Sequence, residues 1–147
     1  MVLHLCSVLA TLGPIGYLTA SGTVATLLTI PCMYWLRTVL DRFQYGVLLL
    51  LFFIITIVVV SGALARLKRS DDPAEIVIDE VLGCLVTFFD VPLSTPSLFV
   101  GLVLFRFFDI LKIGGVQYAE RLVGPWGIVL DDIVAGVLSC VILRMLF

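Results

Sequence analysis

The chain has 147 residues, of which 61% are hydrophobic and only 14% are charged. A soluble domain of this size is about half apolar and about a quarter charged, and much of its surface stays in water. The apolar excess and the net charge of −2 therefore exclude a soluble enzyme, a disordered chain and a nucleic-acid-binding protein as main interpretations. We expect lipid to be the solvent for most of the chain, and the length allows one membrane domain, residues 1–147.

The first third of the chain is apolar but interrupted. Glycines and a proline break residues 3–19, and residues 22–36 are short for a membrane span and contain Pro31. Two arrangements stay open, a short first helix followed by one span, or a re-entrant hairpin. The hairpin is tolerated only where protein or a wet cavity covers its backbone.

The clearest span is residues 46–65, which carry no charge. About 20 apolar residues is the length that a bilayer core requires. The span ends against Arg66, Lys68 and Arg69, which belong in water or among lipid headgroups.

A new helix is expected directly after these basic residues. Asp72 is suited to the N-cap, Pro73 to the first helical position and Glu75 to the third. The helix is predicted over residues 74–91, with Asp79 and Glu80 in its first turns.

Two more helices are predicted toward the C-terminus. Ser94 and the proline that follows start a helix over residues 96–111, a glycine-rich loop covers 112–127, and a last span covers 128–146. The predicted fold is therefore an all-α polytopic membrane bundle of four to five spans.

Alternation of the spans between the two membrane faces brings five carboxylates to one level on one side. They are Asp79, Glu80, Asp109, Asp131 and Asp132. Carboxylates in hydrocarbon cost a few kcal/mol each and are functional by default, and several together repel unless a cation holds them. Because no histidine or thiolate is nearby, two or three of these acids are predicted to hold Mg²⁺, or Mn²⁺ in its place.

Basic residues mark the same face. Arg66, Lys68, Arg69, Lys112 and Arg121 lie on it, whereas Arg37, Arg42 and Arg144 lie on the opposite face. The face with the carboxylates is therefore predicted to be cytoplasmic. A basic rim around a metal–carboxylate cluster at headgroup depth suits a phosphorylated lipid headgroup.

Helix spacing supports the cluster locally. Arg106, Asp109 and Lys112 follow at intervals of three residues and share one stripe of an apolar helix. Gly83 and Gly136 lie about one turn beyond the acids and would let neighbouring helices approach closely.

Each feature also has a simpler interpretation. Asp131 and Asp132 could be a solvated helix start, Arg106 and Asp109 a structural ion pair, and Lys112 a residue that reaches to the interface. Ser21, Gly22 and Thr23 could merely cap a helix.

Several phosphatase chemistries are excluded by the sequence. No cysteine is followed six positions later by arginine, the only histidine is His4, and there is no GxxxxGK[ST] loop. What remains is metal-assisted hydrolysis by carboxylates, with water or an aspartate as the attacking group.

Four runs occur in a recognisable order. They are SGTVATLLTIP (21–31), DPAEIVIDEVLG (72–83), FRFFDILK (105–112) and WGIVLDDIVAGVLS (126–139). Together they resemble the phosphatidylglycerophosphatase A family of bacterial membrane lipid phosphatases, over a core of residues 21–139. The resemblance implies an Mg²⁺-dependent enzyme of the bacterial inner membrane, with a cytoplasmic active site and a phospholipid substrate. Such enzymes convert phosphatidylglycerophosphate to phosphatidylglycerol.

The same resemblance assigns roles to residues. It implies catalytic roles for Asp79, Glu80, Asp131 and Asp132, and metal binding by Glu80, Asp109, Asp131 and Asp132. Thr23, Arg106 and Lys112 would bind the substrate. The sequence departs from the family pattern at Ser21, where proline is expected, at Ile113, where proline is also expected, and at residues 123–125, where His-Gly-Gly is expected. These loop departures put the substrate in more doubt than the metal.

Two rival functions stay open. A small cation carrier or channel would use the same acids as an ion path, and it predicts charges spread through the depth of the bilayer. A non-catalytic, lipid-binding member of the family would bind substrate without turnover.

Overall fold

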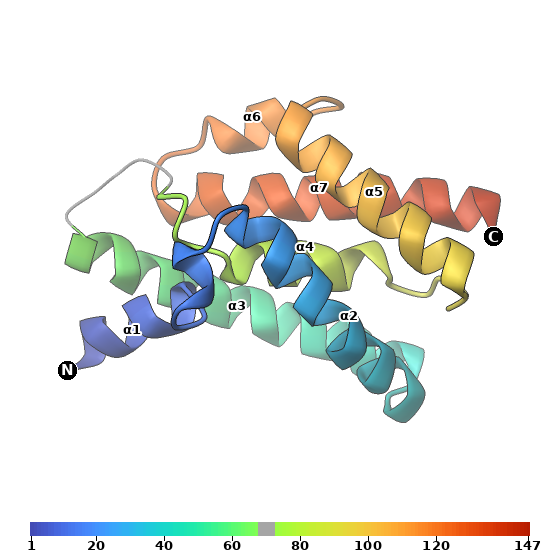
Figure 1. The fold of residues 1–147 in the computed structure, drawn as a ribbon, viewed down its shortest axis with the longest axis horizontal. Helices are drawn as coiled ribbons and strands as arrows, with labels where there is room; N and C mark the ends of the chain where they lie inside the picture. The colour runs from blue at the N-terminus through green and yellow to red at the C-terminus, as the bar shows by residue number, and fades with distance from the viewer. Residues whose placement is uncertain (68–72) are drawn as a thin grey trace.

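A computed structural model describes residues 1–67 and 73–147 of the chain (Figure 1). The described part contains α-helices, one short 3-10 helix and no strand, so the all-α prediction is confirmed there. Lys68, Arg69 and the expected N-cap Asp72 lie outside the described residues.

The N-terminal part consists of a short helix followed by a long one. Helix α1 spans Val2–Ala10, a 3-10 helix η1 spans Ile15–Tyr17, and α2 spans Ser21–Val39 and continues through Pro31. Helix α1 packs along α3 (Arg42–Leu67). The short first helix of the first expected arrangement is present, but the span that should follow it is not confirmed, because α2 is not among the helices that are long and apolar enough to cross a membrane.

Two of the described helices meet that requirement by length and composition. They are α3, with 26 residues, and α7 (Pro125–Leu146), with 22 residues. Helix α4 (Ile78–Thr87) has only 10 residues and α5 (Thr95–Leu111) has 17. A bundle of four to five spans is therefore not confirmed, and membrane insertion rests on α3 and α7.

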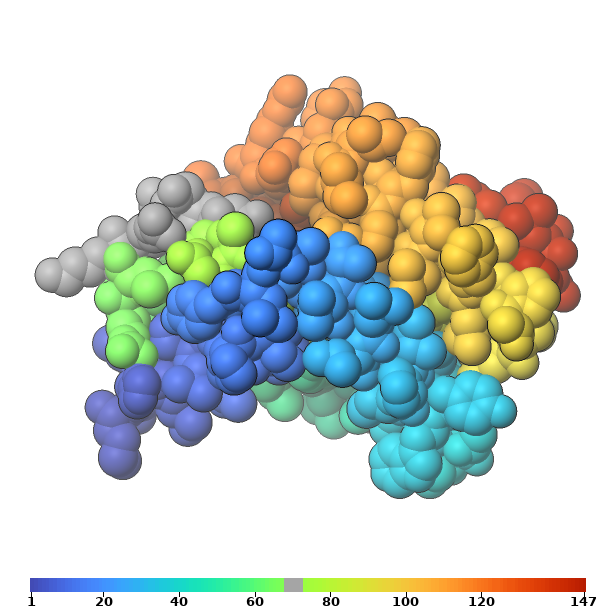
Figure 2. All heavy atoms as spheres, viewed as in Figure 1, coloured from blue at the N-terminus to red at the C-terminus, as the bar shows by residue number. Residues whose placement is uncertain are grey.

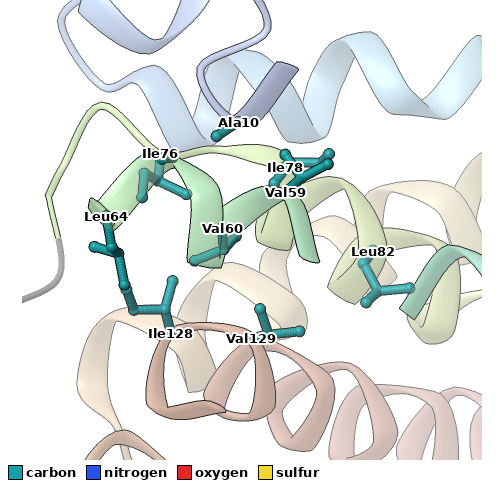
Figure 3. Close-up of a cluster of buried hydrophobic side chains, with 10 residues drawn as sticks. Ala10, Val59, Val60, Leu64, Ile76, Ile78, Leu82, Ile128 and Val129 are labelled. Carbon is teal, nitrogen blue, oxygen red and sulfur yellow. The ribbon is translucent and has the colours of Figure 1, made fainter. Parts of the chain in front are cut away.

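Helix α4 begins later and ends earlier than predicted. The chain before it forms a strap, residues 73–77, in which Ile76 N donates to Pro73 O and Val77 N donates to Ala10 O. Because Val77 is tied to the end of α1, the helix starts only at Ile78. Figure 3 shows Ile76 and Ala10 in one buried cluster with residues of α3 and α7.

Three arginines contact the turn that follows α4. The turn that follows the helix contains Asp90 with a φ of 57°, and the Asp90 carboxylate lies 2.9 Å from Arg144 and 3.2 Å from Arg42. Arg37 donates to Val91 O. Asp90 therefore lies at the opposite end of α4 from the predicted site.

The C-terminal half matches the prediction more closely. Ser94 and Ser97 form a capping box at the start of α5, with proline in the first turn. The predicted loop over 112–127 is wrong in part, because it contains α6 (Val116–Glu120) and the first residues of α7. Helix α7 starts three residues before the predicted start at 128, since Pro125 occupies its first turn.

Helix α4 lies among α2, α3, α5 and α7 and contacts each of them. Its closest neighbour is α7, where a Cβ on Gly136 would lie 2.5 Å from Gly83 O. A Cβ on Gly83 would lie 2.6 Å from the Phe105 ring of α5. The small residues thus allow the close helix approach that the sequence predicts, and this approach positions the acids described next.

Candidate metal and phosphate site

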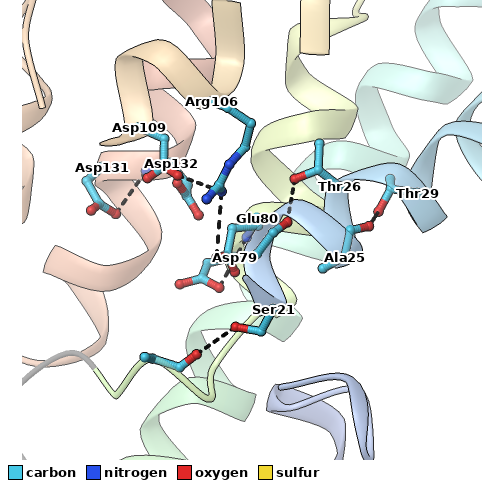
Figure 4. A network of polar contacts seen from close by, with 12 residues as sticks. Ser21, Ala25, Thr26, Thr29, Asp79, Glu80, Arg106, Asp109, Asp131 and Asp132 are labelled. Atoms are coloured by element: carbon cyan, nitrogen blue, oxygen red, sulfur yellow. Dashed lines mark hydrogen bonds and ion pairs between the residues drawn. The ribbon is translucent and has the colours of Figure 1, made fainter. Parts of the chain in front are cut away.

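Three carboxylates from two helices meet at one end of the bundle. Asp79 and Glu80 lie in the first turn of α4, and Asp132 lies in the second turn of α7. One oxygen of each lies within 4.8 Å of the others. Asp79 and Asp132 are 4% and 3% exposed. We refer to these three residues as the acid cluster (Figure 4).

The acid cluster has oxygens that suit a cation. Glu80 Oε2 and Asp132 Oδ1 are buried and have no hydrogen-bond partner among the described residues. A buried carboxylate oxygen without a partner is costly, and three neighbouring carboxylates repel each other. The donors are all oxygen atoms, which is the ligand type that Mg²⁺, Mn²⁺ and Ca²⁺ prefer. The residues present therefore fit a hard divalent cation.

Asp109 and Asp131 are not part of the acid cluster, and both carboxylates pair with the ammonium group of Lys112. Lys112 Nζ lies 3.1 Å from Asp109 Oδ1 and 2.5 Å from Asp131 Oδ2. Burial alone would lower the pKa of Lys112, but its hydrogen bond to Asp131 and the nearby carboxylates outweigh this effect and raise it. The structure thus divides the five predicted acids into a group of three and a pair bound to Lys112.

Arg106 on α5 connects the two groups. Its Nη1 lies 2.7 Å from Asp109 Oδ2 and 3.8 Å from Glu80 Oε1 (Figure 4). The guanidinium is mostly buried, and its Nε has no hydrogen-bond partner among the described residues. The structure contains the ion pair between Arg106 and Asp109 that the simpler interpretation expected. The Arg106 guanidinium also reaches Glu80 of the acid cluster.

A cavity of about 660 Å³ opens beside Arg106 and Glu80. Its walls come from η1 and the loop before α2, the first turn of α2, the strap, Glu80 of α4, and α5. The first turn of α2, the strap and α5 meet on the face shown in Figure 2. Thr23, which the sequence predicts to bind substrate, lines this cavity. We refer to it as the phosphate cavity.

The N-terminus of α2 faces the phosphate cavity without a side-chain cap. The preceding residue, Ala20, has a φ of 58° and makes no capping hydrogen bond, and Ser21 Oγ donates instead to Ala74 O of the strap at 3.0 Å. The first backbone N–H groups of a helix lack partners within the helix and attract anions. The interpretation of residues 21–23 as a simple cap is therefore wrong.

Two other simple interpretations are also wrong. Asp131 and Asp132 do not lie at a solvated helix start, because both are buried and α7 begins six residues before Asp131. Lys112 does not reach to the interface, because its ammonium pairs with two carboxylates.

The sequence singled out Gly22 together with Ser21 and Thr23, but it assigned Gly22 no role in the site. A Cβ on this residue would overlap Glu80 Oε1 and lie 2.9 Å from Arg106 Nη1. Its position between Ser21 and Thr23, both already suspected, was the available signal. The strap residues Glu75 and Ile76, which also line the phosphate cavity, had no such signal.

Comparison with known proteins points to one family. The sequence model of a family described as Phosphatidylglycerophosphatase A matches residues 8–147. The chain is 34% identical over 124 residues to an Escherichia coli protein named Phosphatidylglycerophosphatase A, a match that covers 83% of the chain and 71% of that protein. It is 36% identical over 73 residues to a Haemophilus influenzae protein of the same name, covering 48% of the chain and 45% of that protein.

Another relative carries a different name. A Bacteroides thetaiotaomicron protein, provisionally named a phosphatidylinositol-3-phosphatase, is 33% identical over 78 residues. The match covers 51% of the chain, and the chain spans 49% of the length of that relative. No solved structure matches the chain at a significant level.

Proposed function

The chain belongs to the phosphatidylglycerophosphatase A family, and we propose that it hydrolyses the terminal phosphomonoester of phosphatidylglycerophosphate. Water attacks the terminal phosphorus, the bond from phosphorus to the glycerol oxygen breaks, and that oxygen takes up a proton. The products are phosphatidylglycerol and inorganic phosphate.

One observation carries the proposal. A mostly buried acid cluster, with two oxygens that have no hydrogen-bond partner among the described residues, lies beside a cavity. An arginine and a helix N-terminus that no described side chain caps line this cavity. Carboxylates suit a divalent cation, and a guanidinium with backbone N–H groups suits a phosphate. The two kinds of group meet at Glu80, which belongs to the acid cluster and lines the phosphate cavity.

We assign the metal first to Asp79, Glu80 and Asp132, with Asp109 and Asp131 as the neighbouring acids. When bound, Mg²⁺ would supply positive charge to the carboxylates and to the phosphate oxygens. Arg106 and the first N–H groups of α2 hold the nonbridging oxygens, and the Thr23 hydroxyl donates a further hydrogen bond. One of Asp79, Glu80, Asp131 and Asp132 accepts the proton of the attacking water.

Lys112 has a different role from Arg106 in this proposal. Sequence reasoning expects it to bind substrate, but its ammonium already contacts Asp109 and Asp131. We therefore propose that Lys112 fixes the orientation of these two carboxylates beside the acid cluster. It is a positioning residue, and its substitution acts on the site through Asp109 and Asp131.

We place the protein in the bacterial inner membrane as a multi-pass protein with its site toward the cytoplasm. Arg66 ends α3 near this end of the bundle, and the sequence continues with Lys68 and Arg69. Lys112 and Arg121 add to the same end, whereas Arg42 and Arg144 mark the other. An excess of basic residues is typical of the cytoplasmic side. Family membership does not favour the two rival functions, a cation-conducting protein and a non-catalytic lipid-binding protein.

Phosphate release by the detergent-solubilised protein tests this function. We expect release from phosphatidylglycerophosphate with Mg²⁺, loss with chelator and recovery when Mg²⁺ is added again. Phosphatidylinositol 3-phosphate serves as the comparison substrate, because a relative bears that activity in its name. Turnover that is insensitive to chelator would refute the metal role. Preference for the phosphoinositide would refute the substrate, and absence of release from both lipids would refute the function.

A further inference from the structure

The walls of the phosphate cavity change from polar to apolar. Gly22, Glu80 and Arg106 form its polar part, whereas Leu18 and Ile110 belong to its rim. Leu18 is 51% exposed and Ile110 is 64% exposed. A cavity that received only a hydrated phosphate would not need an apolar rim, because such a rim offers the anion no hydrogen bond.

The apolar rim continues onto the outer surfaces of two helices. Ile110 lies on the same exposed side of α5 as Val103 and Phe99, at intervals of seven and four residues. On α2, Leu27 and Leu28 are exposed below the first turn. The α5 side of the cavity therefore merges with surface that suits lipid tails, and α2 also exposes apolar side chains.

The strap forms a different boundary of the same cavity. Ala74 is exposed and Glu75 is partly exposed there, and Ser21 Oγ donates to Ala74 O across the gap to α2. This boundary is polar, so it suits water and headgroups. The cavity thus has one apolar side, formed by Leu18 of the loop before α2 and Ile110 of α5, and one polar side, at the strap.

From this asymmetry we infer that the phosphate cavity opens sideways into the bilayer between the loop that precedes α2 and the last turn of α5, with Leu18 and Ile110 as the two sides of the opening. The diacylglycerol part of the substrate remains in the membrane, and only its terminal phosphate group passes between these residues toward Arg106. Leu18 and Ile110 thereby select phosphomonoesters that are attached to a membrane lipid. The inference rests on the proposed function, since it names the path by which that substrate reaches the site.

Substitutions that narrow the opening test the path. We compare Leu18→Trp and Ile110→Trp with the parent on two substrates, phosphatidylglycerophosphate with long acyl chains in vesicles and its water-soluble dibutanoyl form. The matched control is Phe99→Trp, because Phe99 lies on the same side of α5 but eleven residues from Ile110. We expect kcat/KM for the long-chain lipid to fall about tenfold in both rim variants, and to change less than about twofold for the dibutanoyl substrate and in the control.

The possible results distinguish a failure of the proposed entry path of the lipid from a failure of the proposed hydrolysis. Equal losses on both substrates would mean a single common entrance, and no loss on the long-chain lipid would mean that the rim lies off the path. Either result overturns the inference. An inactive parent would overturn the proposed function instead.

A labelling measurement tests the path without turnover. The variant Ile110→Cys is made in a Cys32→Ser background, because Cys32 is the exposed native cysteine. Maleimide labelling at position 110 is followed by mass spectrometry. Long-chain phosphatidylglycerophosphate, without added metal, should slow this labelling at least about threefold more than phosphatidylglycerol of the same chain length. Equal rates with the two lipids would overturn the inference, whether or not the parent is active.

Discussion

Gly22 of α2 and Glu80 of α4 are in direct contact, and the contact leaves no room for a side chain at position 22. A Cβ there would overlap Glu80 Oε1. The first turn of α2 can therefore approach the acid cluster only because residue 22 is glycine. This contact brings a helix end whose first N–H groups suit an anion next to carboxylates that suit a cation.

Gly22→Ala should reduce activity more than stability. The added methyl group displaces the end of a flexible side chain, Glu80, so the fold can adjust, but the acid cluster changes shape. We expect phosphatase activity to fall at least about tenfold and the free energy of unfolding to change by less than about 1.5 kcal/mol. Phosphate release and thermal unfolding in detergent measure the two quantities.

Gly46→Ala is the matched control for this variant. A Cβ on residue 46 would lie 3.6 Å from the Phe89 ring, which is an ordinary van der Waals distance. Alanine also stabilises a helix by about 1 kcal/mol relative to glycine. Activity should be unchanged. An equal loss of activity in both variants would show that the Gly22 effect is not specific to Glu80.

Asp132→Asn should abolish metal-dependent activity while making the metal-free protein more stable. The substitution keeps the shape of the side chain and removes one of three neighbouring carboxylates that repel each other, two of which are buried. We expect activity to fall at least about a hundredfold, and the thermal midpoint in chelator to rise. Added Mg²⁺ should stabilise the parent more than the variant, because binding to the folded state raises its stability.

Asp41→Asn is the control for Asp132→Asn, because it removes one negative charge at a position outside the site. Asp41 is exposed before α3, and its Oδ1 accepts from Gln44 N at 2.8 Å, an interaction that asparagine can keep. Stability and activity should match the parent. A variant Asp132→Asn that kept parental activity would remove Asp132 from the proposed site.

Lys112→Met should destabilise the fold, because it leaves Asp131 buried without its cationic partner. We expect a loss of about 2 kcal/mol, less than for a fully buried pair because the Lys112 side chain is 25% exposed. The double variant Lys112→Met with Asp131→Asn should recover part of this loss. No recovery would mean that Lys112 acts through contacts other than this ion pair.

The pH dependence of this ion pair follows from the raised pKa of Lys112. A raised folded-state pKa contributes stability that is fully present below the unfolded pKa of about 10.4 and is lost as the pH rises through the folded value. The Lys112 contribution should therefore stay constant between about pH 7 and about pH 9. Urea unfolding of the parent and the variant at several pH values measures it, and a decline already at neutral pH would contradict the raised pKa.

Gly136→Ala should separate α4 from α7. The added Cβ would lie 2.5 Å from Gly83 O, a backbone atom that cannot rotate away. We expect a loss of about 1–3 kcal/mol in stability. Activity should fall as well, because the distance between these helices sets the spacing of Glu80 and Asp132. A variant with parental stability and activity would show that the two helices can move apart freely.

The sequence correctly predicted the helices that are set by an apolar run or by a capping residue within the same segment. Residues 46–65 form the central part of α3, and the serine and proline near residue 94 start α5 as expected. Helix α4 was predicted too long, because its limits depend on distant partners. Ala10 binds the backbone of Val77 before the helix, and Arg144 contacts the turn after it. No local pattern contains these partners.

The site was partly visible in the sequence. Alternation of spans predicted that distant acids would meet, and the structure brings Asp79, Glu80 and Asp132 together. The division of the remaining acids could not be predicted, because Lys112 could reach several carboxylates from its place on the chain. Only the packing of α5 against α7 selects Asp109 and Asp131 as its partners.

Because α7 starts early, Asp131 and Asp132 lie well inside the helix, and this position affects how strongly dissolved salt screens their charges. Because six residues precede Asp131 in α7, the carboxylates lie about 9 Å inside the end of the helix. The Debye length is about 8 Å at physiological ionic strength, and buried charges are screened much less than exposed ones. We therefore expect changes in cellular ionic strength to weaken the attraction between these buried carboxylates and a bound cation less than they weaken surface ion pairs.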